Sequence, residues 1–362
     1  MKTAGILLTL AALLILLPEP AAADGSVFAP WRNEMYEYSQ LAFIHHDAAS
    51  ARETLHVIPL FSGDAREFAW IVPLPAPPEI VASDIHLFND AERFSQPVYR
   101  HRDEGFKCDD RDYLVGAPGQ DEVEIISDQV VGIYQTLVVT ANDAAALADS
   151  LQGWGYLPPD GDEDAESVLQ YYVAKDWYFA VMRVDTTAFA EQFPYQQDSY
   201  DGAIQPMAFA FDSPEIVYPL RISRLSAAPV SRVLLYVVAD RRTTFAGATT
   251  RFADRITSDE LAGMPGSYPH LANELAAGDF LTKLARNFTP AEMTEDLVLE
   301  PAASNDAYRE LRISGVPLTF LGVWGAPTLG YLVWRLGRGR GEARRRAAGR
   351  RRRPRPRPPR RG

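Results

Sequence analysis

Residues 67–75 read Glu-Phe-Ala-Trp-Ile-Val-Pro-Leu-Pro, the most strongly patterned apolar run after the N-terminal leader. In an extended strand, alternate side chains point to opposite faces, and both sets of side chains are apolar here. The stretch therefore predicts a central strand that is covered on both faces. Pro73 and Pro75 lack the N–H group that a sheet ladder needs, so they predict the end of the strand.

Strand and helix patterns surround this stretch. The runs 38–46 and 54–61 predict two strands before it, and we expect the three to form an antiparallel meander. Further strands are expected at 122–130, 131–140, 177–184, 207–211, 215–223 and 230–239, and helices at 83–95, 143–154, 167–175 and 271–287. The predicted fold class is α+β, mainly antiparallel sheet with packed helices. A short similarity between 68–74 and 209–220 leaves open whether this is one domain or two β lobes.

The N-terminus has the order of features that a secretory signal needs. Lys2 precedes an apolar run at 5–17, and the small residues Ala21-Ala22-Ala23 follow it. We expect residues 1–23 to be a signal peptide, cleaved between Ala23 and Asp24. An uncleaved membrane anchor is the alternative, but the apolar run is short for a span of about 20 residues.

The C-terminal part predicts one transmembrane helix. Residues 313–334 are 22 consecutive uncharged residues between Arg312 and Arg335. As a helix they would extend about 33 Å, enough to cross a hydrocarbon core of roughly 30 Å. Tyr331 and Trp334 lie where interfacial aromatic residues are expected. A buried helix or a loose apolar tail is the alternative reading.

Charge sets the expected orientation of this span. Residues 335–362 contain 14 arginines and one acid, a net charge of +13, whereas the whole chain carries −12, so residues 24–334 carry −25. Arginine clusters next to a span stay in the cytoplasm, which places the acidic part, 24–312, outside the cell membrane. We expect the tail to lie on anionic lipid headgroups. Because lipid accounts for the arginines, we expect no nucleic-acid partner.

The chain has a single cysteine, Cys108, so it forms no internal disulfide, and its core is held by burial. Whether Cys108 pairs between chains stays open. The composition, 47% hydrophobic and 23% charged, is typical of a globular protein rather than a disordered one.

Several separated stretches resemble one bacterial family, the domain of unknown function 2330 family. The stretches are 68–75, 84–88, 155–158, 172–173 with 177–179, 218–221, 281–284 and 292–296. The resemblance implies an exported envelope protein, and the family has no established activity. Many members begin the mature chain with a cysteine-containing stretch, whereas this chain has Asp24-Gly25-Ser26-Val27-Phe28, so no role of those cysteines carries over.

Two clusters are candidate sites for a divalent metal. The first is His45 and His46, with His56 on the next predicted strand, because imidazole is a common zinc ligand. Adjacent strand residues point to opposite faces, so His45 and His46 do not readily share one ion. Ordinary hydrogen-bonded histidines are the alternative, and no cofactor is required.

The second cluster is Asp160, Asp162 and Asp164, which alternate as calcium ligands do. The full calcium-loop pattern fails, since Ala165 stands at its glycine position and Tyr171 at its glutamate position. A helix entry with acids near its N-terminus is the favoured interpretation.

No nucleophile elbow, zinc-protease motif or phosphate-binding loop occurs in the sequence, so it leaves open whether the chain is an enzyme. The first hypothesis is a single-span envelope protein whose outer domain binds an envelope protein or a wall polymer. The second is a metal-assisted hydrolase outside the membrane that uses His45, His46 or His56. Neither the ligand nor the oligomeric state follows from the residues.

Overall fold

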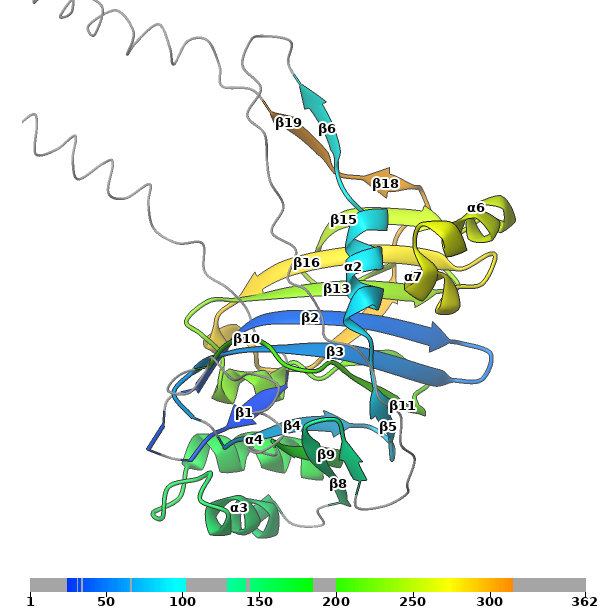
Figure 1. The fold of residues 1–362 in the computed structure, drawn as a ribbon. Coiled ribbons are helices and arrows are strands. Elements are labelled where there is room, and N and C mark those ends of the chain that lie inside the picture. Colours follow the sequence, from blue (N-terminus) through cyan, green and yellow to red (C-terminus); the bar gives the residue numbers. More distant parts are fainter. Residues whose placement is uncertain are drawn as a thin grey trace, which may run out of the picture. The chain divides into compact units, whose positions relative to one another are not determined.

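The computed structural model describes residues 25–101 without 31, 34 and 66, and residues 129–140, 144–184 and 200–314. Described residues up to Val98 and from Gln129 to Glu310 belong to one compact unit, which holds two large β-sheets (Figure 1). Residues 99–101 and 311–314 belong to a second unit, in which β6 (Val98–His101) and β19 (Leu311–Ser314) pair with each other.

The larger sheet has nine strands and is antiparallel except at one place. Strands β2 (Met35–Asp47) and β3 (Arg52–Gly63) form a long hairpin, and β2 pairs in parallel with β13 (Ser231–Ala239). Strand β16 (Phe280–Phe288) follows β13 in the sheet and is antiparallel to it. The other strands are β5 (Glu79–Ala82), β10 (Tyr200–Ala203), β11 (Met207–Asp212), β15 (Thr249–Arg255) and β18 (Tyr308–Arg309).

The smaller sheets complete the first unit. One has five antiparallel strands in the order β1-β4-β9-β8-β7, and another has three, in the order β12-β17-β14. Their bounds are β1 (Ser26–Phe28), β4 (Ala69–Leu74), β7 (Gln129–Val131), β8 (Tyr134–Thr140), β9 (Tyr178–Val184), β12 (Ile216–Tyr218), β14 (Thr243–Thr244) and β17 (Leu297–Pro301). Antiparallel pairing dominates, as predicted, and the fold class is α+β.

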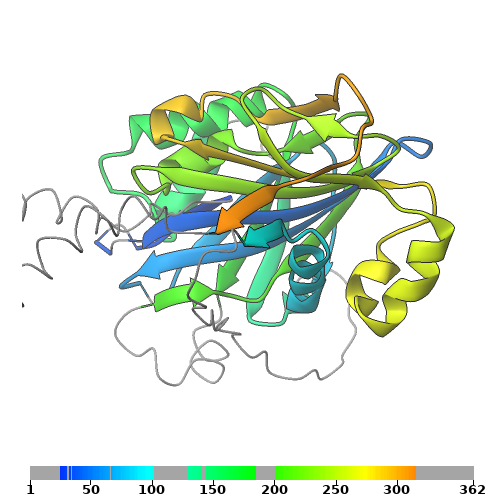
Figure 2. The same cartoon turned by 90° about the horizontal axis from the view of Figure 1, so that it is seen from above.

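Helices cover the outer faces of the two large sheets. Residues of α2 (Ile85–Phe94) and α7 (Pro269–Asn273) pack on the nine-stranded sheet. Residues of α3 (Ala144–Gly153) and α4 (Glu163–Val173) pack on the five-stranded sheet. Figure 2 shows α2, in cyan, beside the yellow segment that holds α7 and α6 (Ser258–Gly263). The first unit is thus layered as helices, sheet, sheet and helices.

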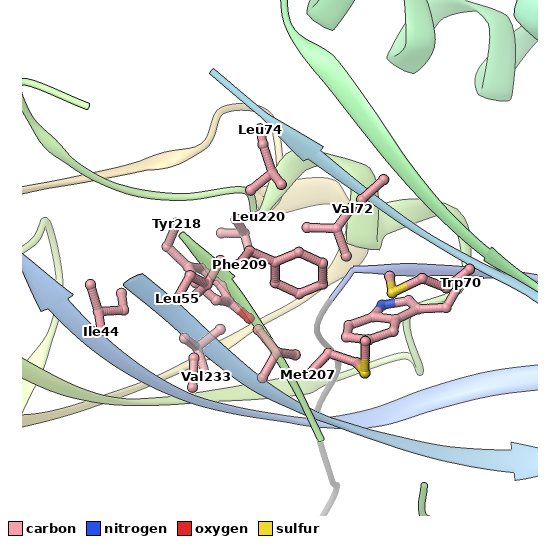
Figure 3. Packing of buried hydrophobic residues seen from close by; sticks show 14 of the residues in the cluster. Ile44, Leu55, Trp70, Val72, Leu74, Met207, Phe209, Tyr218, Leu220 and Val233 are labelled. Carbon is pink, nitrogen blue, oxygen red and sulfur yellow. The ribbon is translucent and has the colours of Figure 1, made fainter. Parts of the chain in front are cut away.

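Strand β4 separates two hydrophobic cores, and all six of its residues are buried. Trp70 and Val72 lie in the core between the two sheets, together with residues of β3 and β11 (Figure 3). Ala69 and Ile71 lie in the second core, against α3 and α4. The prediction of a strand covered on both faces is confirmed. Pro73 lies inside the strand rather than beyond it, since β1 pairs only with 69–71 and leaves it one neighbouring strand.

The predicted meander is wrong in its third strand. β2 and β3 pair antiparallel as expected, but the chain then crosses to the other sheet, where β4 pairs with β1 and β9. A strand that is apolar on both faces needs a covering layer on each side. The position of β4, between the nine-stranded sheet and the helices α3 and α4, supplies both layers.

The predicted helix at 271–287 is also wrong. α7 ends at Asn273, and Phe280–Phe288 forms β16. Gly278 between them has a φ of 103°, which a helix does not allow. The first six residues of β16 are buried, because the strand lies between two others and under α2 and α7. A short, fully buried run has no period that distinguishes a strand from a helix.

The other predicted elements in the described residues differ from the observed ones mainly at their ends, whereas β1, β5, β15, α6 and β17 lie where no element was predicted. α2, α3, β9, β11 and β13 lie where strands and helices were predicted, but Asp84 rather than Ser83 caps α2. The predicted strand at 215–223 keeps only Ile216–Tyr218, after which a 3-10 helix spans Arg221–Leu225. Residues 102–128, with Cys108, lie outside the described residues.

The predicted signal peptide (1–23) and basic tail (335–362) also lie outside the described residues, as does nearly all of the predicted span. Of residues 313–334, only Ile313 and Ser314 are described, and they belong to strand β19. Within the described part of the chain, none of the helices has the length and apolar character needed to cross a membrane.

Candidate functional site

Four of the chain's six histidines gather on the outer face of the nine-stranded sheet, beside α2 and α7. We call this group the histidine cluster. It consists of His45, His56, Ser83, Asp84, His86, His270 and Glu274. The sheet contributes the first two residues, the start of α2 the next three, and α7 with its C-cap the last two. Of the predicted candidates, this cluster includes His45 and His56.

Strand register explains which predicted histidines meet. Phe43 lies opposite His56 in the β2–β3 hairpin and His45 lies opposite Thr54, so His45 and His56 are diagonal neighbours on one face. His46 lies on the other face, where its Nε2 donates a hydrogen bond to the Ser213 carbonyl oxygen at 3.0 Å. The expectation that His45 and His46 point apart is confirmed.

His56 is the best-connected member of the cluster. Only 7% of it is exposed, and its ring packs edge-on against Phe43. Its Nδ1 lies 2.8 Å from the Ser83 hydroxyl, and its Nε2 lies 3.7 Å from Glu274 Oε2. Interaction with the His56 imidazole is the main cause that lowers the pKa of Glu274 below its ordinary value, and the charge of His45 adds to it. Glu274 is therefore an ionised partner for the imidazole.

A second histidine–carboxylate pair lies beside the first. His270 Nδ1 is 3.0 Å from Asp84 Oδ2, and its ring is stacked at a tilt on His86, with 5.1 Å between centroids. Asp84 also caps α2, since its Oδ1 accepts a hydrogen bond from the His86 N–H. The start of α2 and α7 are thereby joined at this corner of the sheet. The negative carboxylate also offsets the positive end of the helix dipole.

Neither predicted metal cluster has a ligand set in the structure. Among the described residues, no group of three or more His, Cys, Asp or Glu side chains is placed to hold a metal ion. The second candidate, the acidic run, serves α4 instead: Asp162 caps the helix, and Asp164 pairs with Arg224 at 2.7 Å. Asp160 is exposed before it. This matches the interpretation as a helix entry.

A buried glutamate lies opposite His46 on the inner face of the sheet. Glu53 is fully buried; its Oε2 accepts a hydrogen bond from the Val217 N–H at 2.9 Å, and its Oε1 has no hydrogen-bond partner among the described residues. Burial raises the pKa of Glu53 well above its ordinary value. The folded chain therefore favours the protonated carboxyl, which carries no charge into the core.

We predict that Glu53→Gln removes a pH-dependent loss of stability. Because the folded pKa of Glu53 is raised, the unfolded chain releases this proton first, from about pH 4.3 upward, and stability falls as pH rises toward the folded pKa. Each pH unit between the pKa of Glu53 in the unfolded chain and its pKa in the folded chain lowers the free energy of unfolding by about 1.4 kcal/mol. The gain in the free energy of unfolding that Glu53→Gln brings, measured in urea, should thus grow as the pH rises above about 4.3. Glu215→Gln, at an exposed position, controls for the loss of one carboxyl. An advantage independent of pH would contradict the assignment.

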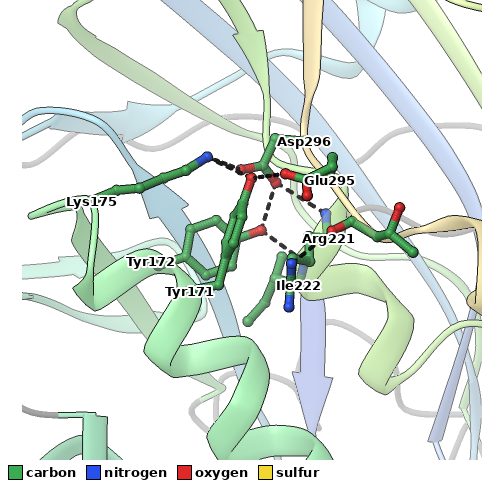
Figure 4. A network of polar contacts seen from close by, with 8 residues as sticks. Tyr171, Tyr172, Lys175, Arg221, Ile222, Glu295 and Asp296 are labelled. Carbon is green, nitrogen blue, oxygen red and sulfur yellow. Dashed lines mark hydrogen bonds and ion pairs between the residues drawn. The ribbon is translucent and has the colours of Figure 1, made fainter.

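A second polar group, the Asp296 network, joins α4 to two distant segments (Figure 4). It consists of Tyr171, Tyr172, Lys175, Arg221, the N–H of Ile222, Glu295 and Asp296. Asp296 Oδ1 accepts hydrogen bonds from the Tyr172 hydroxyl at 2.7 Å and the Arg221 N–H at 3.1 Å. The Tyr172 hydroxyl accepts one from the Ile222 N–H at 2.9 Å. The Lys175 ammonium lies 3.7 Å from Asp296 Oδ2.

The Asp296 network holds separate segments of the chain together. Burial, followed by the charge of Asp296, raises the pKa of both Tyr171 and Tyr172, so both phenols stay protonated as hydrogen-bond donors. Burial also raises the pKa of Asp296, partly offset by the hydrogen bond from Tyr172. The Arg221 guanidinium stacks on the Tyr171 ring at 4.1 Å. These groups bind one another, and they hold α4 against the segments 221–222 and 295–296 beside the second core.

Three stretches that carry the family resemblance meet in this network. Tyr172 comes from one, Arg221 from the next and Asp296 from the third, and 124 residues separate the two that share the 2.7 Å hydrogen bond. A model of the family described as "Uncharacterized protein conserved in bacteria (DUF2330)" matches residues 18–300. The chain belongs to this family. The predicted resemblance is confirmed.

Other comparisons add little to the DUF2330 assignment. No curated protein matches the chain. One solved structure, "crystal structure of baculovirus P35", is similar at 10% identity over 79% of this chain and 99% of that one, with a TM-score of 0.30. A similarity at that TM-score carries no argument about fold or function.

Sequence reasoning did not find the remaining members of the histidine cluster. Ser83 was assigned to a helix start, Asp84 was assigned to a helix start and to the family resemblance, and His270 and Glu274 lie about 180 residues further along the chain. No local spacing links these positions. The sequence feature that bears on the cluster is the scarcity of histidine: the chain has six, and four of them lie in the cluster.

Proposed function

We propose that this DUF2330 member is an exported envelope protein, held in the cell membrane by one C-terminal span. Its α+β domain, 24–312, would lie outside the membrane and its arginine-rich tail, 335–362, inside. The order of charged, apolar and small residues at 1–23 supports export. The uncharged stretch at 313–334, followed by 14 arginines, supports the span and its orientation.

We further propose that the outer domain is a binding module for an envelope protein or a wall polymer. The observation that carries this role is the net charge of −25 on residues 24–334. The side chains of Glu53 and Asp296 are buried and held by internal partners, whereas most of the other Asp and Glu residues in the described part of the chain are exposed. An acidic surface attracts cationic groups over a screening length of about 8–10 Å. The partner should therefore present amines or guanidinium groups.

We predict that labelling of intact cells reveals this topology. In a Cys108→Ser background of the full chain, Ala303→Cys lies at an exposed position of the outer domain, and Ala347→Cys lies in the tail. A membrane-impermeant maleimide should label the first in osmotically shocked cells, and the second only after the membrane is dissolved. Labelling of both positions, or of neither, before lysis would contradict the proposed topology.

A metal-assisted hydrolase outside the membrane is the second candidate function. Its support is that the predicted candidates His45 and His56 share a face with Glu274, although these three are not placed as a ligand set and His46 lies on the other face. Chelation of the purified full chain, followed by zinc or calcium, separates the two functions through the unfolding midpoint. A native-state ligand at 100 times its Kd adds about 2.7 kcal/mol, which is a measurable shift.

A further inference from the structure

Three side chains of the histidine cluster form a line across separate elements of the fold. Ser83 follows the edge strand β5, His56 lies on β3, and Glu274 ends α7. The Ser83 hydroxyl is 2.8 Å from His56 Nδ1, and His56 Nε2 is 3.7 Å from Glu274 Oε2. A hydroxyl, an imidazole and a carboxylate in this order are the parts of a nucleophilic triad, although the two ring nitrogens have exchanged roles relative to the Ser-His-Asp arrangement, in which the hydroxyl contacts Nε2.

The sheet holds the serine in place against the histidine. In the ladder, Ala208 lies opposite both His56 and Val81, so the three residues form a row across β3, β11 and β5. Ser83 comes two residues after Val81, and its N–H donates to the Pro206 carbonyl oxygen at 2.9 Å. The main chain at Ser83 is therefore held next to the sheet, by the segment that leads into β11.

A role as base requires one particular tautomer of His56. To accept the Ser83 hydroxyl proton at Nδ1, the neutral ring must carry its own proton on Nε2. That atom is buried, has no hydrogen-bond partner among the described residues and lies closest to the Glu274 carboxylate. Contacts of this kind are often long without substrate and shorten in the reacting complex.

We propose that Ser83, His56 and Glu274 form a triad that hydrolyses small carboxylic esters. Ser83 Oγ attacks the ester carbonyl carbon while its proton passes to His56 Nδ1. The bond to the leaving alcohol then breaks, and His56 returns the proton to that alcohol. A water molecule attacks the acyl-serine with His56 again as base, which releases the carboxylic acid and restores the hydroxyl. Glu274 stabilises the imidazolium of His56 during both acylation and deacylation, as the carboxylate of a triad does.

The surroundings indicate the class of ester. Val81, which is 57% exposed, belongs to this row across β3, β11 and β5 and offers an apolar surface for a short acyl chain. Asp84 and Glu274 disfavour anionic substrates, so neutral or cationic esters are expected.

The test uses the full chain in detergent with p-nitrophenyl acetate as substrate. We expect hydrolysis above the rate in buffer, and a loss of at least about 100-fold in both Ser83→Ala and His56→Gln. Ser95→Ala, at the other end of α2, and His46→Gln, on the opposite face of the same strand pair, are matched controls that should keep the activity. Equal rates in Ser83→Ala and the wild type would overturn the proposal.

A second readout does not depend on turnover or on the choice of ester. A fluorophosphonate probe should label Ser83 in the wild-type chain, as identified in the labelled peptide, and should fail to label it in His56→Gln. Unfolding midpoints of the variants show whether each one is folded. Absence of label on wild-type Ser83, or equal labelling in a folded His56→Gln, would overturn the triad. The topology experiment is independent of this result.

Discussion

Replacing Trp70 with alanine should lower the free energy of unfolding by about 3–5 kcal/mol, the largest effect we expect from one side chain in the core. Trp70 is fully buried, and its ring packs against Phe209 at 5.8 Å and Tyr134 at 6.2 Å between centroids. It thus joins β4 to the facing sheet through β11. Because protein interiors are closely packed, the neighbouring side chains do not move enough to fill the space left by the indole. Urea unfolding of the full chain measures the change.

Trp154→Ala is the matched control, because it removes the same side chain from a position that is 39% exposed. Its ring contacts Arg183 at 5.8 Å but belongs to none of the buried cores. We expect a loss of less than about 1 kcal/mol. Similar losses in the two variants would contradict the central position of Trp70.

Asp296→Ala is the second large effect, with an expected loss of about 3 kcal/mol or more. The substitution leaves the buried Tyr172 hydroxyl and the Arg221 N–H without their acceptor, and Lys175 without its ion pair. Glu295→Ala is the neighbouring control. Glu295 accepts one exposed hydrogen bond from Tyr171, so its loss should cost under about 1 kcal/mol. Equal losses in urea unfolding would show that the Asp296 network does not hold α4.

Local sequence patterns were sufficient to predict those features that depend on one strand or helix alone. The alternation around Trp70 predicted a strand buried on both faces, because side chains alternate wherever that strand lies. The same pattern does not say which strands are neighbours, so β4 was assigned to the wrong sheet. Residues 280–288 show where such patterns fail. Because the strand is buried on both faces, its sequence has no alternation of apolar and polar residues, and it was predicted to be part of a helix.

The candidate site was predictable only in part, for a related reason. His45 and His56 are 11 residues apart in one hairpin, and the register of that hairpin brings them together. Glu274 and His270 reach the same corner only because α7 packs against α2, with Asp90 accepting hydrogen bonds from the first N–H groups of α7. Such contacts depend on tertiary packing, and no spacing in the chain encodes them.

Because β4 contributes side chains to both hydrophobic cores, we predict that it joins them into one cooperative unit. Hydrogen exchange of the full chain, compared between the wild type and Trp70→Ala, tests it most directly. The segment 55–58 of β3 reports on the nine-stranded sheet, and the segment 168–172 of α4 reports on the second core. We predict that exchange rises by about the same factor in both segments. A rise confined to β3, with α4 unchanged, would contradict the claim and indicate two independent lobes.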